Sequence, residues 1–201
     1  MRSCPCLLCL ILAALLGACA TAGQQYIKVA YTGTADPMDQ TRIAVVPLVD
    51  QRPDTETSYL GRRILMDNSQ ETYLVMGMDL AWSLTTSLTD FLVQKGATTK
   101  EMQEFPESPE AAAESPKELS RIITGRVEKF EVQAQKKGAL TEMQLDISLT
   151  FSVALPETGQ IKTVPVAYSL EKTLVSFSRQ KLETFVNGAV AEILAKAGLL
   201  E

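Results

Sequence analysis

The sequence predicts an α/β (α+β) fold: a two-layer sandwich in which a mostly antiparallel sheet carries two amphipathic helices on one face. Apolar residues recur at spacings of three and four within residues 79–95 and 178–197, as on one side of a helix. From residue 143 to 155 apolar and polar residues alternate, as in a strand with one buried face. Helices and strands that are apolar on one side pack against each other in layers.

The first nineteen residues have the layout of an export signal. Arg2 precedes an apolar run over residues 7–16, and the small residues Gly17 and Ala18 follow it. The alternative is a transmembrane anchor, but a bilayer span needs roughly 20 apolar residues and this run is about half that length. We therefore expect residues 1–18 to be removed as a signal peptide.

Residues 16–19, Leu-Gly-Ala-Cys, resemble the lipobox of bacterial lipoproteins. The resemblance implies that Cys19 receives a diacylglyceryl group and that its new amine is acylated. Each buried methylene contributes about 0.8 kcal/mol, so several acyl chains anchor a protein almost permanently. Ala20 stands where inner-membrane lipoproteins of enteric bacteria have aspartate. The resemblance therefore implies the periplasmic face of the outer membrane.

Beyond Cys19 the sequence predicts a lipidated N-terminus and tether at 19–40 and a single domain at 41–201. Within the tether, residues 26–31 are interpreted as an extended segment or edge strand. Residues 42–49 are continuously apolar, which is typical of a strand covered on both faces, although Pro47 cannot donate to a sheet ladder.

The next elements are less regular until the first helix. Residues 59–63 are interpreted as an excursion loop and residues 71–76 as a short strand. The helix at 79–95 ends before Gly96, and a weak strand at 97–104 follows it. Residues 105–117, rich in Glu, Pro and Ala, are expected to form a solvated loop that buries nothing.

The second half predicts a meander of three long antiparallel strands and a closing helix. In the strand at 121–135 the apolar residues change from odd-numbered to even-numbered positions, which indicates a β-bulge near Glu128 and Lys129. A hairpin turn at 136–138 leads to the strand at 143–155. A partner strand centred on residues 164–170 precedes the helix at 178–197, which Gly198 ends.

Composition removes several classes of function. The chain has no histidine, and its cysteines are Cys4, Cys6, Cys9 and Cys19, so the mature domain cannot build a Cys/His zinc site or a His-dependent nucleophile. The net charge is −5 without a lysine/arginine cluster, which makes nucleic acid an unsuitable partner. We expect no cofactor and no metal.

Residues 40–201 resemble the YajG-type envelope lipoproteins in the order of their elements. The resemblance rests on the lipobox, the strand running into Asp50-Gln51-Arg52, the helix ending at Gly96, the three strands and the final helix. A more distant resemblance is to auxiliary lipoproteins of ABC-type transport systems, which place Asp-x-Arg after an early strand. The first implies an outer-membrane protein of undefined activity, and the second a non-catalytic part of an envelope transport complex.

Charged residues supply the candidate sites. Asp50 and Arg52, with Asp54, predict a corner that binds a partner or ligand; alternatively they bond a turn and pair with each other. Arg62 and Arg63 match phosphate geometry and predict a contact with lipid headgroups; alternatively they are simply solvated.

Pairs of acids are a further candidate. Glu128 with Glu131, or Asp146 opposite Glu171, offer an acid/base pair, although hydrolysis of a glycan needs a cleft that no pattern indicates. The alternative is that these acids lie scattered on the polar faces of strands. Five methionines are interpreted as core filling rather than metal ligands: Met66, Met76, Met78, Met102 and Met143.

These observations favour a non-enzymatic, membrane-tethered interaction module of an envelope assembly or transport system, with an envelope protein as partner. One alternative is a lipoprotein that holds a lipid or glycan ligand between sheet and helices. A second alternative is a carboxylate-based hydrolase.

Overall fold

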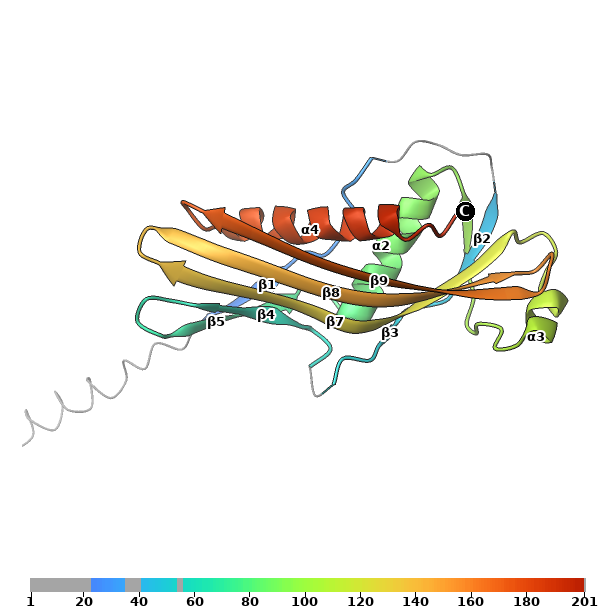
Figure 1. The fold of residues 1–201 in the computed structure, drawn as a ribbon, viewed down its shortest axis with the longest axis horizontal. Coiled ribbons are helices and arrows are strands. Elements are labelled where there is room, and N and C mark those ends of the chain that lie inside the picture. Colours follow the sequence, from blue (N-terminus) through green and yellow to red (C-terminus); the bar gives the residue numbers. More distant parts are fainter. Residues whose placement is uncertain (1–22, 35–40, 54–55, 201) are drawn as a thin grey trace, which may run out of the picture.

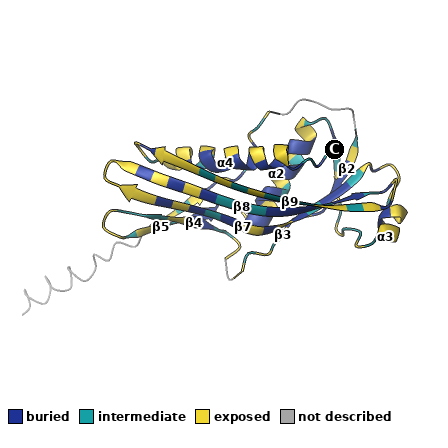
Figure 2. Ribbon diagram, in the orientation of Figure 1, coloured by how far each residue is buried: buried dark blue, intermediate teal, exposed yellow. Residues whose placement is uncertain are grey.

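The computed structural model describes residues 23–34, 41–53 and 56–200. The expected signal peptide and Cys19 lie outside these residues. The fold is mixed α+β, with a long, curled sheet and two helices, α2 (Leu80–Gln94) and α4 (Arg179–Lys196), that pack on the same face of it (Figure 1). The main core lies between this face and the two helices, where Figure 2 shows buried residues on both elements.

The meander is confirmed. Strands β7 (Arg121–Lys137), β8 (Leu140–Leu155) and β9 (Gln160–Leu174) pair antiparallel in chain order. Gly138 and Gly159 adopt positive φ angles of 60° and 68° in the two connecting turns. Alternate residues of β8 are buried against the helices, as the period of two requires: Met143, Leu145, Ile147, Leu149, Phe151 and Val153.

The predicted bulge in β7 is also confirmed. The register with β8 shifts between Val127 and Lys129, which leaves Glu128 without a partner residue. As a result Val127 and Phe130 both lie in the core, with 0% and 1% of their surface exposed. A regular strand would have placed one of the two in water.

The rest of the sheet is mixed, which corrects the prediction of a mostly antiparallel sheet. Strands β2, β3 and β4 run parallel to successive stretches of β7, β1 runs parallel to β5, and β6 runs parallel to β2. Among the described strands, only β5, beside β4, adds another antiparallel pairing. The bounds are β1 (Gln24–Ile27), β2 (Arg42–Val45), β3 (Val49–Asp50), β4 (Tyr59–Ile64), β5 (Gln70–Val75) and β6 (Thr98–Glu101).

Two strand predictions need correction. The continuous strand at 42–49 is interrupted at Pro47, where the amide of Leu48 donates to the Thr85 hydroxyl (2.9 Å) instead of to the sheet. The excursion loop at 59–63 is strand β4, inside the sheet between β5 and β7. The sequence pattern does not indicate this strand, because the segment contains Gly61 and two arginines and only one buried aliphatic residue, Leu60.

The prediction of a solvated loop that buries nothing at 105–117 is wrong as well. It contains the short helix α3 (Pro109–Glu114), which Ser108 caps by accepting from the amide of Ala111. Ala112 is fully buried in a small second core on the far side of β2. Members of this second core are Ala44, Val46, Ala112, Leu119, Ile122 and Ala154.

Both long helices are confirmed with their ends. Asp79 caps α2 by accepting from the amide of Trp82 (2.7 Å), and Ser178 caps α4 in the same manner. Gly96 follows α2 with a φ of 92°. The folded domain begins earlier than residue 41, because β1 belongs to the sheet and Ile27 is fully buried in the main core.

Candidate functional site

The structure brings Asp50 and Arg52 together as a buried ion pair. Arg52 Nη2 lies 2.7 Å from Asp50 Oδ2, and the side chains are 4% and 10% exposed. Arg52 Nη1 also donates to the carbonyls of Tyr59 (2.6 Å) and Phe130 (3.2 Å). The guanidinium thus joins β3 to β4 and β7, and this use leaves it little capacity for an external partner. Asp54 lies outside the described residues.

Arg62 and Arg63 are not brought together, because successive strand residues point to opposite faces. Arg63 is 11% exposed, lies 3.4 Å from Glu71 and places its guanidinium 4.0 Å from the centre of the Phe177 ring. Arg62 is exposed on the open face of the sheet. The two arginines therefore do not form one phosphate site.

Two acids of the open face, Glu128 and Asp146, are stabilised as carboxylates. Hydrogen bonds from Thr150 (2.8 Å) and Ser148 (3.0 Å) lower the pKa of Glu128. A hydrogen bond from Ser169 (2.8 Å), followed by one from Lys129 (3.0 Å), lowers the pKa of Asp146. A general acid needs the opposite shift, so neither Glu128 nor Asp146 has the electrostatics of a general acid.

The predicted placement of Asp146 opposite Glu171 is wrong. Asp146 pairs with Ser169, whereas Glu171 lies opposite Gln144. Arg62, Gln133, Gln144 and Glu171 instead form a row across β4, β7, β8 and β9. This row lines a shallow depression of about 450 Å³ on the open face.

The space between the sheet and the two helices is filled. A void of about 10 Å³ remains there, lined by apolar residues such as Phe130 and Ile193. A cavity needs at least about 10–15 Å³ to hold one water molecule. A lipid between sheet and helices therefore has no room in this conformation.

A groove of about 400 Å³ lies between α2 and the edge strand β6. Pro47 and Leu48, at the break between β2 and β3, lie in its lining. One wall is α2 with Met78 and Trp82, and the other is β6 with Thr99. Such a groove combines apolar contact surface with nearby polar groups.

Residue spacing on α2 explains this wall. Trp82, Thr85, Thr86 and Thr89 recur at three- and four-residue spacing on the side of the helix away from the core stripe. Trp82 is the only tryptophan in the chain and is 49% exposed, and Met78 is 67% exposed. Large apolar side chains are thus presented to solvent beside a row of hydroxyl groups.

The sequence suggested that all five methionines fill the core, and this prediction is wrong for three of them. Met143 is buried and Met102 packs against the second core, but Met66, Met76 and Met78 are exposed. Sequence reasoning also missed Trp82 as a candidate residue. The available signal was a tryptophan placed among threonines on the polar side of an amphipathic helix.

The backbone of β6 adds hydrogen-bonding groups beside the groove. Thr98 and Met102 donate their amides to carbonyls of residues at or next to β2 (2.8 and 3.0 Å). Because strand residues alternate, the backbone groups of Thr99 and Glu101 face away from β2. Among the described strands only β2 pairs with β6, so this edge has no strand partner.

Residues 23–34, 41–53 and 56–200 hold no group of three or more acidic, cysteine or histidine side chains placed to bind a metal. In the same residues, no helix is both long and apolar enough to cross a bilayer.

No family model matches the chain, and no curated protein matches it in sequence. Solved structures that are similar to it include a DUF330 protein from Xanthomonas campestris, with a TM-score of 0.48, 8% identity, and coverage of 86% of this chain and 90% of that one. Lipoprotein GNA1162 from Neisseria meningitidis has a TM-score of 0.41 and 12% identity, over 78% of this chain and 99% of its own.

A third similar structure is a minor lipoprotein from Acinetobacter baumannii, with a TM-score of 0.34 and 12% identity, covering 78% of this chain and 87% of its own. The structural neighbours thus include a DUF330 protein and bacterial lipoproteins. Membership of the YajG-type family stays a prediction.

Proposed function

We propose that this chain is a lipid-anchored, non-catalytic interaction module of the bacterial envelope, which binds an extended segment of a protein partner in the groove beside β6. The anchor is Cys19, and the protein sits on the periplasmic face of the outer membrane. The observation that carries the proposal is the exposed Trp82 and Met78 beside an unpaired strand edge.

A free strand edge and an apolar groove together favour an extended polypeptide over a small molecule. An added strand gains affinity from backbone hydrogen bonds and specificity from pockets for alternate side chains. The outward backbone groups of Thr99 and Glu101 supply the first, and the groove supplies a pocket of about 400 Å³ for the second. Tryptophan and methionine are both enriched among anchor residues of protein interfaces.

The absence of histidine, and of cysteine after Cys19, supports a non-catalytic role. The chain has no histidine, and its cysteines all fall in the first nineteen residues. Of the acids that the sequence singled out, Glu128 and Asp146 have lowered pKa values and accept hydrogen bonds from neighbouring hydroxyl groups. Such carboxylates organise a surface rather than exchange protons near neutral pH.

A photo-crosslinking amino acid at Thr86, which is exposed in the groove, tests the partner site in living cells. Val93 is the matched control, since it lies on the same helix, is 52% exposed and lies outside the groove. We expect a protein adduct from position 86 that Trp82→Ser abolishes, with its crosslinked peptide in an extended segment. An equal adduct from position 93, or one insensitive to Trp82→Ser, contradicts the groove.

The lipid anchor is tested separately. Cys19→Ala should abolish incorporation of labelled palmitate and release the protein from sedimented membranes. Continued labelling of this variant would overturn the lipobox assignment. Cys9 is the control cysteine, because it follows bulky Leu8 rather than small residues, and its substitution should leave labelling unchanged.

The open sheet face supports a second candidate function, binding of an envelope glycan. The in-register row of Arg62, Gln133, Gln144 and Glu171 offers planar amide, guanidinium and carboxylate groups to sugar hydroxyls. Calorimetric titration with soluble peptidoglycan fragments tests it. Heat of binding that Gln144→Ala removes would support the glycan, and no heat at millimolar fragment would dismiss it.

A further inference from the structure

Three turns meet at one end of the sheet. They connect β4 to β5 (residues 65–69), β7 to β8 (residues 138–139) and β9 to α4 (residues 175–178). The registers bring them together, because Ile64 pairs with Gln135 and Thr141 pairs with Leu174. We name this region the three-turn end; it is the end of the long axis opposite α3 (Figure 1).

Each of these turns exposes one large apolar side chain, either within the turn or on the strand residue that follows it. Met66 is 65% exposed, Leu140 is 41% exposed and Val175 is 79% exposed. Turn residues are normally small or polar, and single exposed apolar residues are ordinary. Here, however, three exposed apolar side chains lie close together, because adjacent strands are only about 4.8 Å apart. Turn geometry does not explain such a group.

The folded domain also begins at this end. Gln24 pairs with Thr72, two residues into β5 from the turn at 65–69. Only four residues lie between Cys19 and Gln24, so the five Cα-to-Cα steps that join them span at most about 18 Å. By contrast β8, with 16 residues, is about 53 Å long. An acyl group on Cys19 therefore holds the three-turn end closer to the bilayer than the α3 end.

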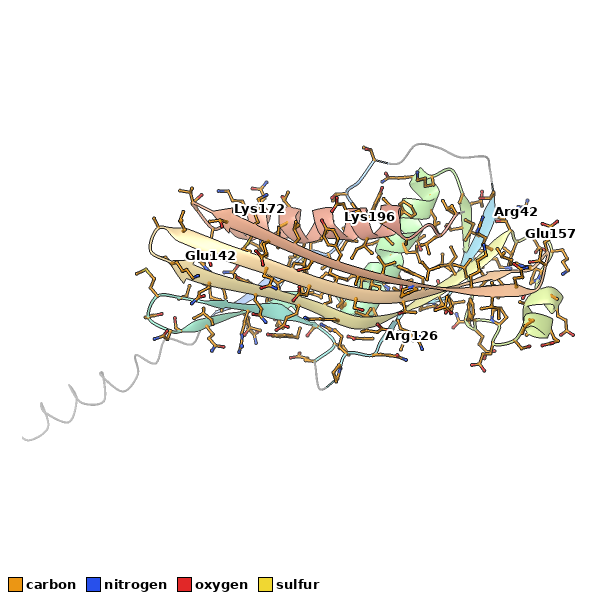
Figure 3. All side chains as sticks on the ribbon, in the orientation of Figure 1. Arg42, Arg126, Glu142, Glu157, Lys172 and Lys196 are labelled. Carbon is orange, nitrogen blue, oxygen red and sulfur yellow. The ribbon has the colours of Figure 1, made fainter. Side chains whose placement is uncertain are left out.

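Charge distinguishes the two ends in the same direction. The turns and the strand ends beside them carry Lys136 and Lys137 against Asp67 and Glu142, and Glu142 pairs with Lys137 (2.6 Å). The α3 end, residues 101–118, carries one lysine against six exposed glutamates: Glu101, Glu104, Glu107, Glu110, Glu114 and Glu118. Figure 3 shows Lys172 and Glu142 towards the three-turn end, and Arg42 and Glu157 towards the α3 end. An anionic lipid surface repels the α3 end and tolerates the other.

We propose that the three-turn end is a membrane-docking surface, on which Met66, Leu140 and Val175 enter the interfacial layer of the bilayer while Lys136 faces lipid phosphates. This inference rests on the proposed anchor at Cys19 and goes beyond it, because it fixes the orientation of the domain. The long axis then points away from the membrane, and the acidic α3 end faces the envelope space.

The test uses the full chain, purified from membranes and reconstituted in vesicles of phosphatidylethanolamine and phosphatidylglycerol with brominated acyl chains, which quench nearby tryptophan. In a Trp82→Phe background, tryptophan replaces Met66, Leu140 or Val175, one at a time. The matched controls are native Trp82 and Val93→Trp, which lies in the last turn of α2, before β6.

We expect loss of emission from all three turn positions and unchanged emission from both controls. Acylated protein whose turn positions are quenched no more than Trp82 overturns the docking surface and leaves the anchor intact. Protein without acyl chains whose turn positions are still quenched overturns the anchor and retains the docking surface. Quenching of Val93→Trp equal to that of the turns would show a domain lying flat, which contradicts the proposed orientation.

Discussion

The two sides of β7 are held by different kinds of structure. Towards β8 a ladder of antiparallel pairs runs from Ile122 to Lys137 with a single interruption at the bulge. On its other side three separate strands, β2, β3 and β4, each cover a short stretch of β7 in parallel. The first side is a continuous hairpin, whereas the second is assembled from pieces that the chain brings together over long separations.

This difference determines what holds each side together. A hairpin is closed by a short turn and needs little else, because its partners are neighbours in the chain. The parallel side relies on specific close contacts at its junctions. The missing side chain of Gly61 on β4 lets the backbone of Val132 on β7 approach closely. Arg52 donates hydrogen bonds to one carbonyl of β4 and one of β7.

The sharpest contrast comes from the same substitution on each side. At Gly61 the φ of 151° and a Cβ only 1.9 Å from the Val132 carbonyl oxygen leave no room for a side chain. We expect Gly61→Ala to lower the free energy of unfolding by about 5 kcal/mol or more, or to prevent folding. At Gly138, in the β7–β8 turn, a Cβ meets nothing, and the cost should be roughly 1–2 kcal/mol. Urea unfolding of both variants measures this contrast; equal losses would contradict it.

The bulge gives the largest effect on the hairpin side. Phe130→Ala should cost about 3–5 kcal/mol, because the side chain is fully buried, and Val127→Ala should destabilise as well. Lys129→Ala should cost less than about 1 kcal/mol, since its ion pair with Asp146 is half exposed. Deleting Lys129 should be far worse than Lys129→Ala, because the shift turns one apolar set outward. Similar urea midpoints for the two Lys129 changes would contradict this account.

The hairpin side could be predicted because its information is local. Alternation over residues 143–155, a parity switch near Glu128 and glycine turns each report on neighbouring residues. The parallel side could not, because β4 contains Gly61, Arg62 and Arg63 and is paired with residues about seventy positions away. No pattern in the residues of β4 indicates that this strand pairs with β7.

The Arg52 junction tests the parallel side at a polar contact. Arg52→Ala leaves the carboxylate of Asp50, 10% exposed, and the carbonyls of Tyr59 and Phe130 without their donor. We expect a loss of about 3 kcal/mol, the lower end for a broken buried pair because the corner lies close to water. Arg62→Ala, on an exposed arginine of β4, is the control and should stay within about 0.5 kcal/mol. If both variants melt alike in urea, Arg52 does not hold the junction.

Of the candidate site, only single residues could be predicted. Asp50 and Arg52 are close in sequence, and the alternative prediction that they pair with each other matches the observed 2.7 Å contact. The groove could not be predicted, because Trp82 and Thr99 come to line it only after α2 returns the chain to pair β6 with β2. The three-turn end depends likewise on registers that bring separate turns together.

The smallest expected effect is the pH dependence of the hairpin side. Glu128 and Asp146 have lowered pKa values in the folded protein, so their contribution to stability is complete above their unfolded pKa values, about 4.3 and 3.9. That contribution is lost as the pH falls through the lower, folded pKa values. Urea midpoints measured from pH 7 to pH 3 should therefore fall less steeply below pH 4.5 for Glu128→Gln and Asp146→Asn than for the wild type. From pH 6 to 8 all three proteins should have flat profiles, because the chain has no histidine to titrate there. A wild-type profile that changes between pH 6 and 8, or variants as acid-sensitive as the wild type, would show that these carboxylate bonds do not stabilise the β7–β8–β9 face.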